Sequence, residues 1–89
     1  MKEILTNATI FRAIEQGFGI EGATDNIEVD RGDSVHFANV LYKDTLRTTR
    51  FVRIEFMLKS KGWEVIGIDG KISLKAINSI NDFIKAFTK

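Results

Sequence analysis

The sequence predicts an α+β fold of two layers, in which an antiparallel meander of three to five strands carries an N-terminal and a C-terminal helix on one face. Three observations lead to this prediction. Apolar residues recur at helical spacing near both ends of the chain, and apolar and polar residues alternate over several short runs between them. No proline interrupts these segments, and every link is short enough for neighbouring strands to pair antiparallel. The chain of 89 residues is expected to form one domain.

The first expected element is a helix over residues 4–18. Its apolar positions follow three- and four-residue steps and form one stripe: Ile4, Ala8, Phe11, Ile14 and Phe18. Gly17 and Gly19 are expected to end the helix, because glycine tolerates the left-handed turn that follows many helices. An alternative start is a cap at Asn7, which would leave residues 2–6 extended.

Alternation predicts strands over residues 27–30, 34–42, 47–59 and 63–68, after a loop over residues 19–25. Turn signals such as Arg-Gly-Asp, Ser-Lys-Gly and Asp-Gly separate these runs. Both sides of the second run are fairly apolar, which predicts an interior strand with something on each face.

The strand over residues 47–59 has the clearest pattern. Its even positions are apolar: Val52, Ile54, Phe56 and Leu58. Its odd positions include Phe51, Arg53, Glu55 and Met57. A slip of one residue would expose the whole apolar row, so the strand's orientation toward the core is well determined.

Residues 72–76 have two possible structures. The alternation of Ile72, Leu74 and Ala76 allows a fifth strand, whereas a helix that begins near Ser73 is the other possibility. The last helix is expected to start at a capping box formed by Ser79 and Asp82.

Composition excludes several classes of protein. There is no cysteine and only one histidine, His36, which excludes disulfide scaffolds, thiolate sites and multi-histidine metal sites. No apolar run is long enough to span a membrane. The N-terminal residues lack the apolar stretch of a signal peptide, so a cytoplasmic location is expected.

We expect no enzyme activity, no catalytic residue, no metal and no cofactor. Ser34 and His36 share one face of their strand, but residues two apart on a strand rarely bring a hydroxyl and an imidazole into hydrogen-bonding geometry. His36 is expected to be a partly buried sheet residue with one hydrogen bond. A small nuclease is a less favoured alternative, because Glu55 and Lys59 are two residues too far apart for the usual Glu-x-Lys pattern.

The expected function is that of a small non-catalytic binding module, such as a regulator, an inhibitor or an assembly subunit. If both helices cover one face of the sheet, the other face carries exposed apolar and basic side chains, which usually mark a partner surface. The candidate binding residues are Arg47, Arg50, Phe51, Arg53, Met57, Lys59 and Lys61. The expected partner is another protein or a second copy of the chain. The competing interpretation is that a helix or a second subunit covers Phe51 and Met57, and that Arg53 pairs with Glu55 or with an acid of the first third of the chain.

Nucleic-acid binding through the hairpin over residues 47–61 is the alternative function. Residues 1–30 carry two basic and six acidic side chains, whereas residues 31–61 carry seven basic and three acidic ones. Arginines interleaved with aromatic residues can pair with phosphates and stack on bases. The segment over residues 50–56 is similar to the sheet motif of RNA-recognition domains, although it lacks the glycines of that motif and the order of elements differs.

Overall fold

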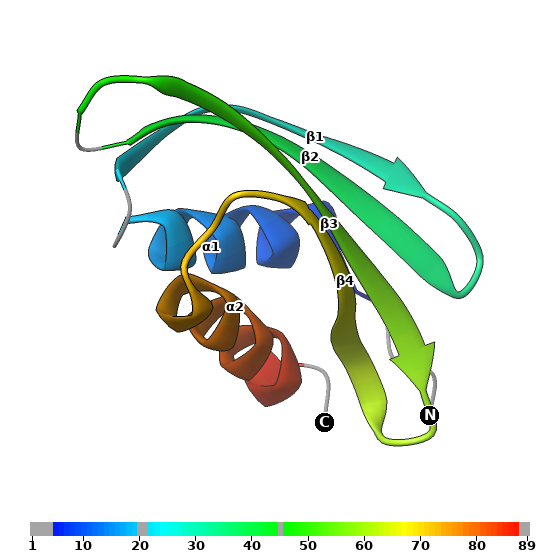
Figure 1. The fold of residues 1–89 in the computed structure, drawn as a ribbon. Helices are drawn as coiled ribbons and strands as arrows, with labels where there is room; N and C mark the ends of the chain where they lie inside the picture. Colours follow the sequence, from blue (N-terminus) through cyan, green and yellow to red (C-terminus); the bar gives the residue numbers. More distant parts are fainter. Residues whose placement is uncertain (1–4, 20–21, 45, 88–89) are drawn as a thin grey trace.

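The computed structural model describes residues 5–19, 22–44 and 46–87. In chain order the elements are α1 (Asn7–Phe18), β1 (Gly22–Arg31), β2 (Val35–Asp44), β3 (Thr49–Lys59), β4 (Gly62–Gly70) and α2 (Leu74–Phe87). The strands form one antiparallel sheet in the order β1-β2-β3-β4, and the sheet bends over both helices, which lie on the same side of it (Figure 1). The predicted two-layer α+β fold is confirmed, with four strands.

Helix α1 is the shorter of the two alternatives, and Thr6 rather than Asn7 caps it. The Thr6 hydroxyl oxygen accepts a hydrogen bond of 3.2 Å from the backbone N–H of Thr9. The predicted apolar stripe is correct at Ile14 and Phe18, which are buried, and wrong at Ala8, which is exposed, and at Phe11, which is 38% exposed. The buried residues of the helix instead follow the spacing i, i+3, i+4, i+7 and i+8: Ile10, Ala13, Ile14, Gly17 and Phe18. Ile4 lies outside the described residues.

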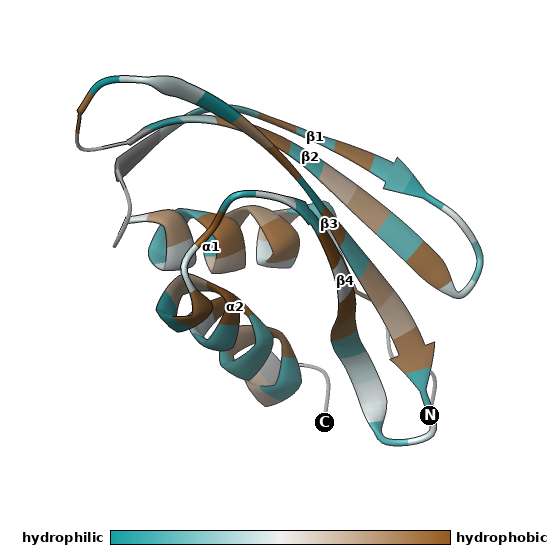
Figure 2. Cartoon of the chain, in the orientation of Figure 1, coloured by the Kyte–Doolittle hydropathy of each residue, from teal (hydrophilic) through white to brown (hydrophobic). Residues whose placement is uncertain are grey.

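Strict alternation along β3 directs one set of side chains toward the helices. Val52, Ile54 and Phe56 are fully buried, and their partners on β2 are Val40, Ala38 and His36. Bands of hydrophobic and hydrophilic residues alternate along the strands, as the period of two requires (Figure 2). This face of the sheet and the two helices enclose the hydrophobic core. The predicted interior position of β2 is confirmed, but the expected cover on both of its faces is not, because the described helices lie on one face only.

Strand β1 is longer than the sequence indicates, because it begins at Gly22 within the predicted loop. Its first half lacks the apolar alternation, and its register against β2 shifts between Thr24 and Asn26, which places a bulge there. The turn signals Arg-Gly-Asp, Ser-Lys-Gly and Asp-Gly coincide with the ends of β1, β3 and β4. Gly62 and Gly70 have φ angles of 118° and 125°, which side chains rarely adopt.

Helix α2 begins at Leu74, so the fifth strand and the capping box at Ser79 were both wrong. The Ser73 hydroxyl oxygen accepts a hydrogen bond of 3.1 Å from the backbone N–H of Ala76 and thereby caps the helix. Ala76, Ile80 and Ile84 are fully buried at steps of four residues. Ile72 and Leu74 lie before this buried stripe in the sequence. Together with Ala76 they produce the alternating pattern that allowed a strand.

Gly17 allows the two helices to approach closely, and it does not end α1 as predicted. A Cβ atom at this position would collide with the Ile80 side chain and lie 3.0 Å from the backbone oxygen of Ala76. Gly19, which follows the helix, has a right-handed φ of −57°. The helix thus ends before Gly19, as predicted, but without a left-handed turn, and Gly17 is explained by the contact between the helices.

Helix α2 also covers part of the free edge of β4. The side-chain oxygen of Asn81 accepts a hydrogen bond of 3.1 Å from the backbone N–H of Val65. The register between β3 and β4 shifts at this point, so the helix satisfies a backbone group beside a bulge. The hydroxyl of Tyr42 similarly donates to the backbone oxygen of Lys71 at 2.8 Å, which ties β2 to the segment before α2.

Candidate binding face of the sheet

The side chains that point away from the helices form what we call the open face of the sheet. The registers arrange them in rows across the strands. One central row contains Glu28, Asn39, Arg53 and Asp69, and the next contains Asp30, Phe37, Glu55 and Gly67. Apolar pairs lie on either side of these rows, because Leu41 is the partner of Phe51 and Val35 is the partner of Met57.

The apolar side chains of the open face are accessible to solvent to different degrees. Phe51 is 55% exposed and its cross-strand partner Leu41 is 37% exposed. Val35, Phe37 and Met57 are half-buried. The described helices do not cover these side chains, since both lie against the opposite face (Figure 1). The structure therefore does not support the competing interpretation that a helix of this chain covers Phe51 and Met57.

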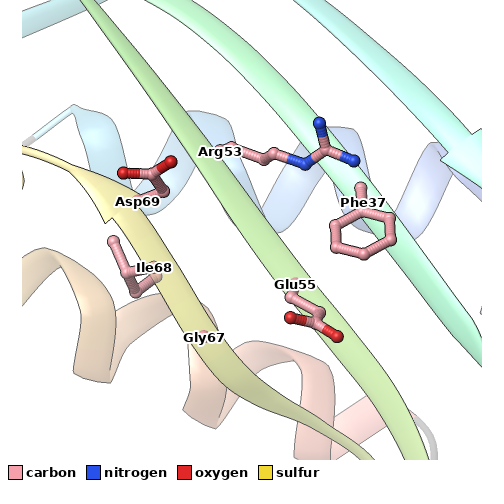
Figure 3. A pocket seen from close by; sticks show the side chains of 6 residues that line it. All are labelled: Phe37, Arg53, Glu55, Gly67, Ile68 and Asp69. Atoms are coloured by element: carbon pink, nitrogen blue, oxygen red, sulfur yellow. The ribbon is translucent and has the colours of Figure 1, made fainter.

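Arg53 stacks on an aromatic ring at the centre of the open face. Its guanidinium carbon lies 4.2 Å from the centroid of the Phe37 ring, which is a cation–π geometry (Figure 3). Within the described part of the chain, this ring is the only partner seen for Arg53, so neither Glu55 nor an acid of the first third pairs with it. The N–H donors of the guanidinium are therefore available to a ligand or a partner.

A shallow hollow of about 180 Å³ lies beside this stack. Gly67 contributes no side chain at this point, and the carboxylates of Glu55 and Asp69 flank the hollow from β3 and β4 (Figure 3). A Cβ atom at Gly67 would lie 3.2 Å from a carboxylate oxygen of Glu55, so the glycine leaves room for that side chain.

Charge on the open face differs between its centre and its edges. In the two central rows, the middle strands carry Arg53 and Glu55, whose charges balance. The edge strands carry Glu28 and Asp30 on β1 and Asp69 on β4. The side-chain amide of Asn39 donates to Asp30 at 3.2 Å. The centre of the face is thus close to neutral, and its edges are acidic.

The structure brings four of the seven predicted binding residues onto the open face. Phe51, Arg53, Met57 and Lys59 occupy the odd positions of β3, with Lys59 at the end of the strand. Phe51, Arg53 and Lys59 are exposed, whereas Met57 is half-buried between its neighbours.

The other three predicted residues do not lie on the open face. Arg50 is half-buried and is the cross-strand partner of the buried Tyr42, so it follows the helix-facing row. Arg47 lies before β3, in the left-handed conformation with a φ of 65°. Lys61 lies after β3, in the turn to β4, beside a hollow of about 350 Å³ that Trp63, Glu64 and Lys85 also line. An 11-residue strand is roughly 35 Å long, so Arg47 and Lys61 do not share one patch.

The sequence reasoning missed the half of the site that comes from β2. Phe37, Leu41 and Val35 were assigned to one side of their strand, but nothing in the sequence paired them with β3. The missing information is the register, because the link between β2 and β3 is not a two-residue turn that would determine it.

His36 is more buried than predicted, and its hydrogen-bond partners among the described residues are backbone atoms rather than the Ser34 hydroxyl. It is 3% exposed on the helix-facing side, where its ring stacks on Trp63 with centroids 4.4 Å apart. Its Nδ1 lies 3.0 Å from the backbone oxygen of Val35 and 3.3 Å from the backbone nitrogen of Gly32. Burial, followed by the positive charge of Arg31, lowers the pKa of His36, although the contact with Val35 opposes this shift.

Within the ranges that the structure describes, no three acidic or histidine side chains gather closely enough to hold a metal ion. Comparison with protein families, with curated proteins and with solved structures found no match to this chain. Neither described helix is long and apolar enough to cross a membrane.

Proposed function

We propose that the chain is a small protein-binding module whose binding surface is the open face of the sheet. The observation that carries this proposal is the cross-strand pair of exposed apolar side chains, Phe51 and Leu41, on a face that the described helices leave uncovered. The solvated face of an antiparallel sheet normally presents polar side chains. Contiguous apolar groups on such a face are characteristic of a surface that is covered by a partner.

The centre of the face has the composition of an interface core. Aromatic residues, methionine and arginine are enriched at the centres of protein interfaces. The central strands supply Phe37, Phe51, Met57 and an arginine, Arg53, that is held in place on an aromatic ring. Stacking reduces the conformational freedom that the arginine would lose on binding, and its N–H groups remain available to donate to a partner's oxygen atoms.

The distribution of charge favours a protein partner over the nucleic-acid alternative. A phosphate backbone requires several cations along one surface. The basic residues of the hairpin instead divide between the open face, the helix-facing side and the two ends of β3. Carboxylates from Glu28, Asp30 and Asp69 line the edges of the open face and would repel phosphates.

Peptide selection tests this function while the identity of the partner is still open. Random linear peptides displayed on phage are selected against the chain immobilised at low density, and the recovered peptides are titrated against variants. We expect most of them to lose at least about tenfold in affinity for Phe51→Ser, which corresponds to about 1.4 kcal/mol. Leu74→Ser is the matched control, because Leu74 is 72% exposed but lies on α2. Peptides that bind both variants equally would contradict the proposal.

A second arm of the experiment addresses the nucleic-acid alternative. A labelled pool of single-stranded oligonucleotides is titrated against the wild-type chain and against Arg53→Gln. We expect no binding that depends on Arg53. Binding that requires Arg53 and weakens steeply with salt would favour the alternative over the proposed function.

A further inference from the structure

The open-face side chains of β3 are symmetric about the middle of the strand. From Phe51 to Met57 their order is apolar, positive, negative and apolar: Phe51, Arg53, Glu55 and Met57. A twofold axis that crosses the strand between positions 53 and 55 would place position 51 opposite position 57, and position 53 opposite position 55. In such a pair, Phe51 packs on Met57 of the second copy and Arg53 meets Glu55 of the second copy.

Strand β2 extends the same symmetry. The axis places Leu41 opposite Val35 of the second copy, so both flanking rows bring apolar groups together. At the centre, Asn39 faces Phe37 of the second copy, whose ring Arg53 of that copy already covers. The middle strands contribute eight side chains to these four rows: Val35, Phe37, Asn39, Leu41, Phe51, Arg53, Glu55 and Met57. Five of them are apolar and the two charges cancel.

Arg53 and Glu55 are available for contacts between two copies. Among the residues that the structure describes, neither side chain forms a hydrogen bond or an ion pair with the other or with a third residue. Arg53 and Glu55 lie two residues apart on β3, so both point to the open face. If β3 of the second copy ran parallel in the same register, like charges would meet. Opposite charges meet only if it runs antiparallel. A twofold axis perpendicular to the strands produces that arrangement.

The shape of the sheet keeps the acidic edges apart. The sheet bends around the helices, so the open face is its outer, convex side (Figure 1). Two convex faces touch at their centres, and packed sheets also cross at about 30°. The neutral middle strands then make the contact, while Glu28 and Asp30 on β1 and Asp69 on β4 remain at the solvated rim.

We infer that the occupant of the open face is a second copy of this chain, packed face to face about a twofold axis that crosses β3 between Arg53 and Glu55. This inference rests on the proposed function and names its partner. Two strands over four rows cover an area of roughly 10 Å by 25 Å. An interface of this size belongs to the weak, reversible class, well below the roughly 1,200 Å² of total buried area that is typical of stable complexes.

Charge reversal in two chains tests this geometry directly. Sedimentation velocity is measured from about 10 µM to about 1 mM, a range suited to a weak interface. The wild-type mass should rise from 10.1 kDa toward twice that value. Arg53→Glu and Glu55→Arg should each remain monomeric, because each places like charges opposite one another at two symmetric positions. An equal mixture of the two variants should form the dimer again, since both opposed pairs then have opposite charges.

Two further variants separate loss of contact from loss of fold. Phe51→Ser should abolish the dimer without a change of charge, whereas Leu74→Ser should leave it intact. The circular dichroism of every variant should match that of the wild type.

Each other outcome overturns the inference in an identifiable way. A dimer that survives both single charge reversals uses another surface. A mixture that stays monomeric while the wild type dimerises excludes the twofold register. A wild type that stays monomeric throughout excludes self-association, and peptides that bind in a Phe51-dependent manner would then leave the proposed function standing.

Discussion

The imidazole of His36 lies on the helix-facing side of the sheet, where its environment disfavours a positive charge. It stacks on Trp63, has Phe56 as its cross-strand partner and lies close enough to Arg31 to be repelled when protonated. Burial is the largest cause of its lowered pKa. Protonation of His36 therefore links pH to the stability of the fold.

The sign of that link follows from proton binding. The unfolded chain has a histidine pKa of about 6.5 and the native pKa is lower, so between the two values the unfolded state binds more protons. The stability due to neutral His36 is complete above about pH 6.5 and is lost as the pH falls toward the native pKa. We expect the free energy of unfolding in urea to decrease between about pH 7.5 and about pH 5.5 with a slope of up to about 1.4 kcal/mol per pH unit. The variant His36→Gln should be less stable overall, and its free energy of unfolding should vary less with pH over this range. Equal slopes in the two proteins would contradict the assignment.

At the scale of the element, the start of α2 depends on one hydroxyl group. Ser73 caps the helix through the backbone N–H of Ala76, whereas Ser79 lies about one turn and a half inside it. Ser73→Ala should therefore lower the free energy of unfolding by about 1 kcal/mol, because one backbone donor loses its partner. Ser79→Ala is the matched control and should change stability by less than about 0.5 kcal/mol, since alanine suits a helix interior. Chemical denaturation compares them, and a larger loss at Ser79 would restore the cap that the sequence suggested.

Periodicity predicted which elements form, but local signals misplaced several of their ends. The alternation on β3 identified Phe51, Arg53 and Met57 as outward-facing, because a strand with one apolar row has a single stable orientation. Segments with ambiguous patterns were less predictable. Ile72 and Leu74 alternate like a strand although Ser73 caps a helix, and the stripe of α1 was misassigned because Gly17 belongs to the helix–helix contact.

The candidate site was predictable on β3 and not beyond it. Arg53 was expected to face outward, but its stacking on Phe37 depends on a cross-strand register that the link between β2 and β3 does not specify. The acidic edges could not be predicted either. Glu28 and Asp69 can be placed in the same row as Arg53 only when the registers of all three strand pairs are known. The middle of the chain is basic in sequence, whereas the open face of the folded sheet has a nearly neutral centre and acidic edges.

At the scale of the whole molecule, the two faces of the sheet have separate roles. The helix-facing side holds the core, so substitutions there change stability. The open face contributes little to that core, so its apolar side chains can be replaced by polar ones at small cost to the fold. This separation is what allows Phe51→Ser to test binding, since a strand surface position of this kind alters stability by roughly 1 kcal/mol or less.

The acidic edges predict how salt should affect self-association. When two open faces meet, Glu28 on β1 of one copy lies across the solvated rim from Asp30 on β1 of the other, and these like charges repel through solvent. Salt screens exposed charges over a Debye length of about 10 Å at 0.1 M, whereas the apolar contacts do not weaken and the Arg53–Glu55 pairs at the covered centre are screened much less. The dimer should therefore tighten several-fold between about 0.02 M and about 0.5 M salt, in contrast to a nucleic-acid complex, which would weaken.

Glu28→Gln should tighten the dimer at low salt and lose this advantage at high salt, while Glu15→Gln on the exposed side of α1 should have no effect. Sedimentation equilibrium at both salt concentrations measures the difference. A dimer that dissociates as salt rises would contradict this prediction, because it would show that attraction between charges outweighs the repulsion between the acidic edges.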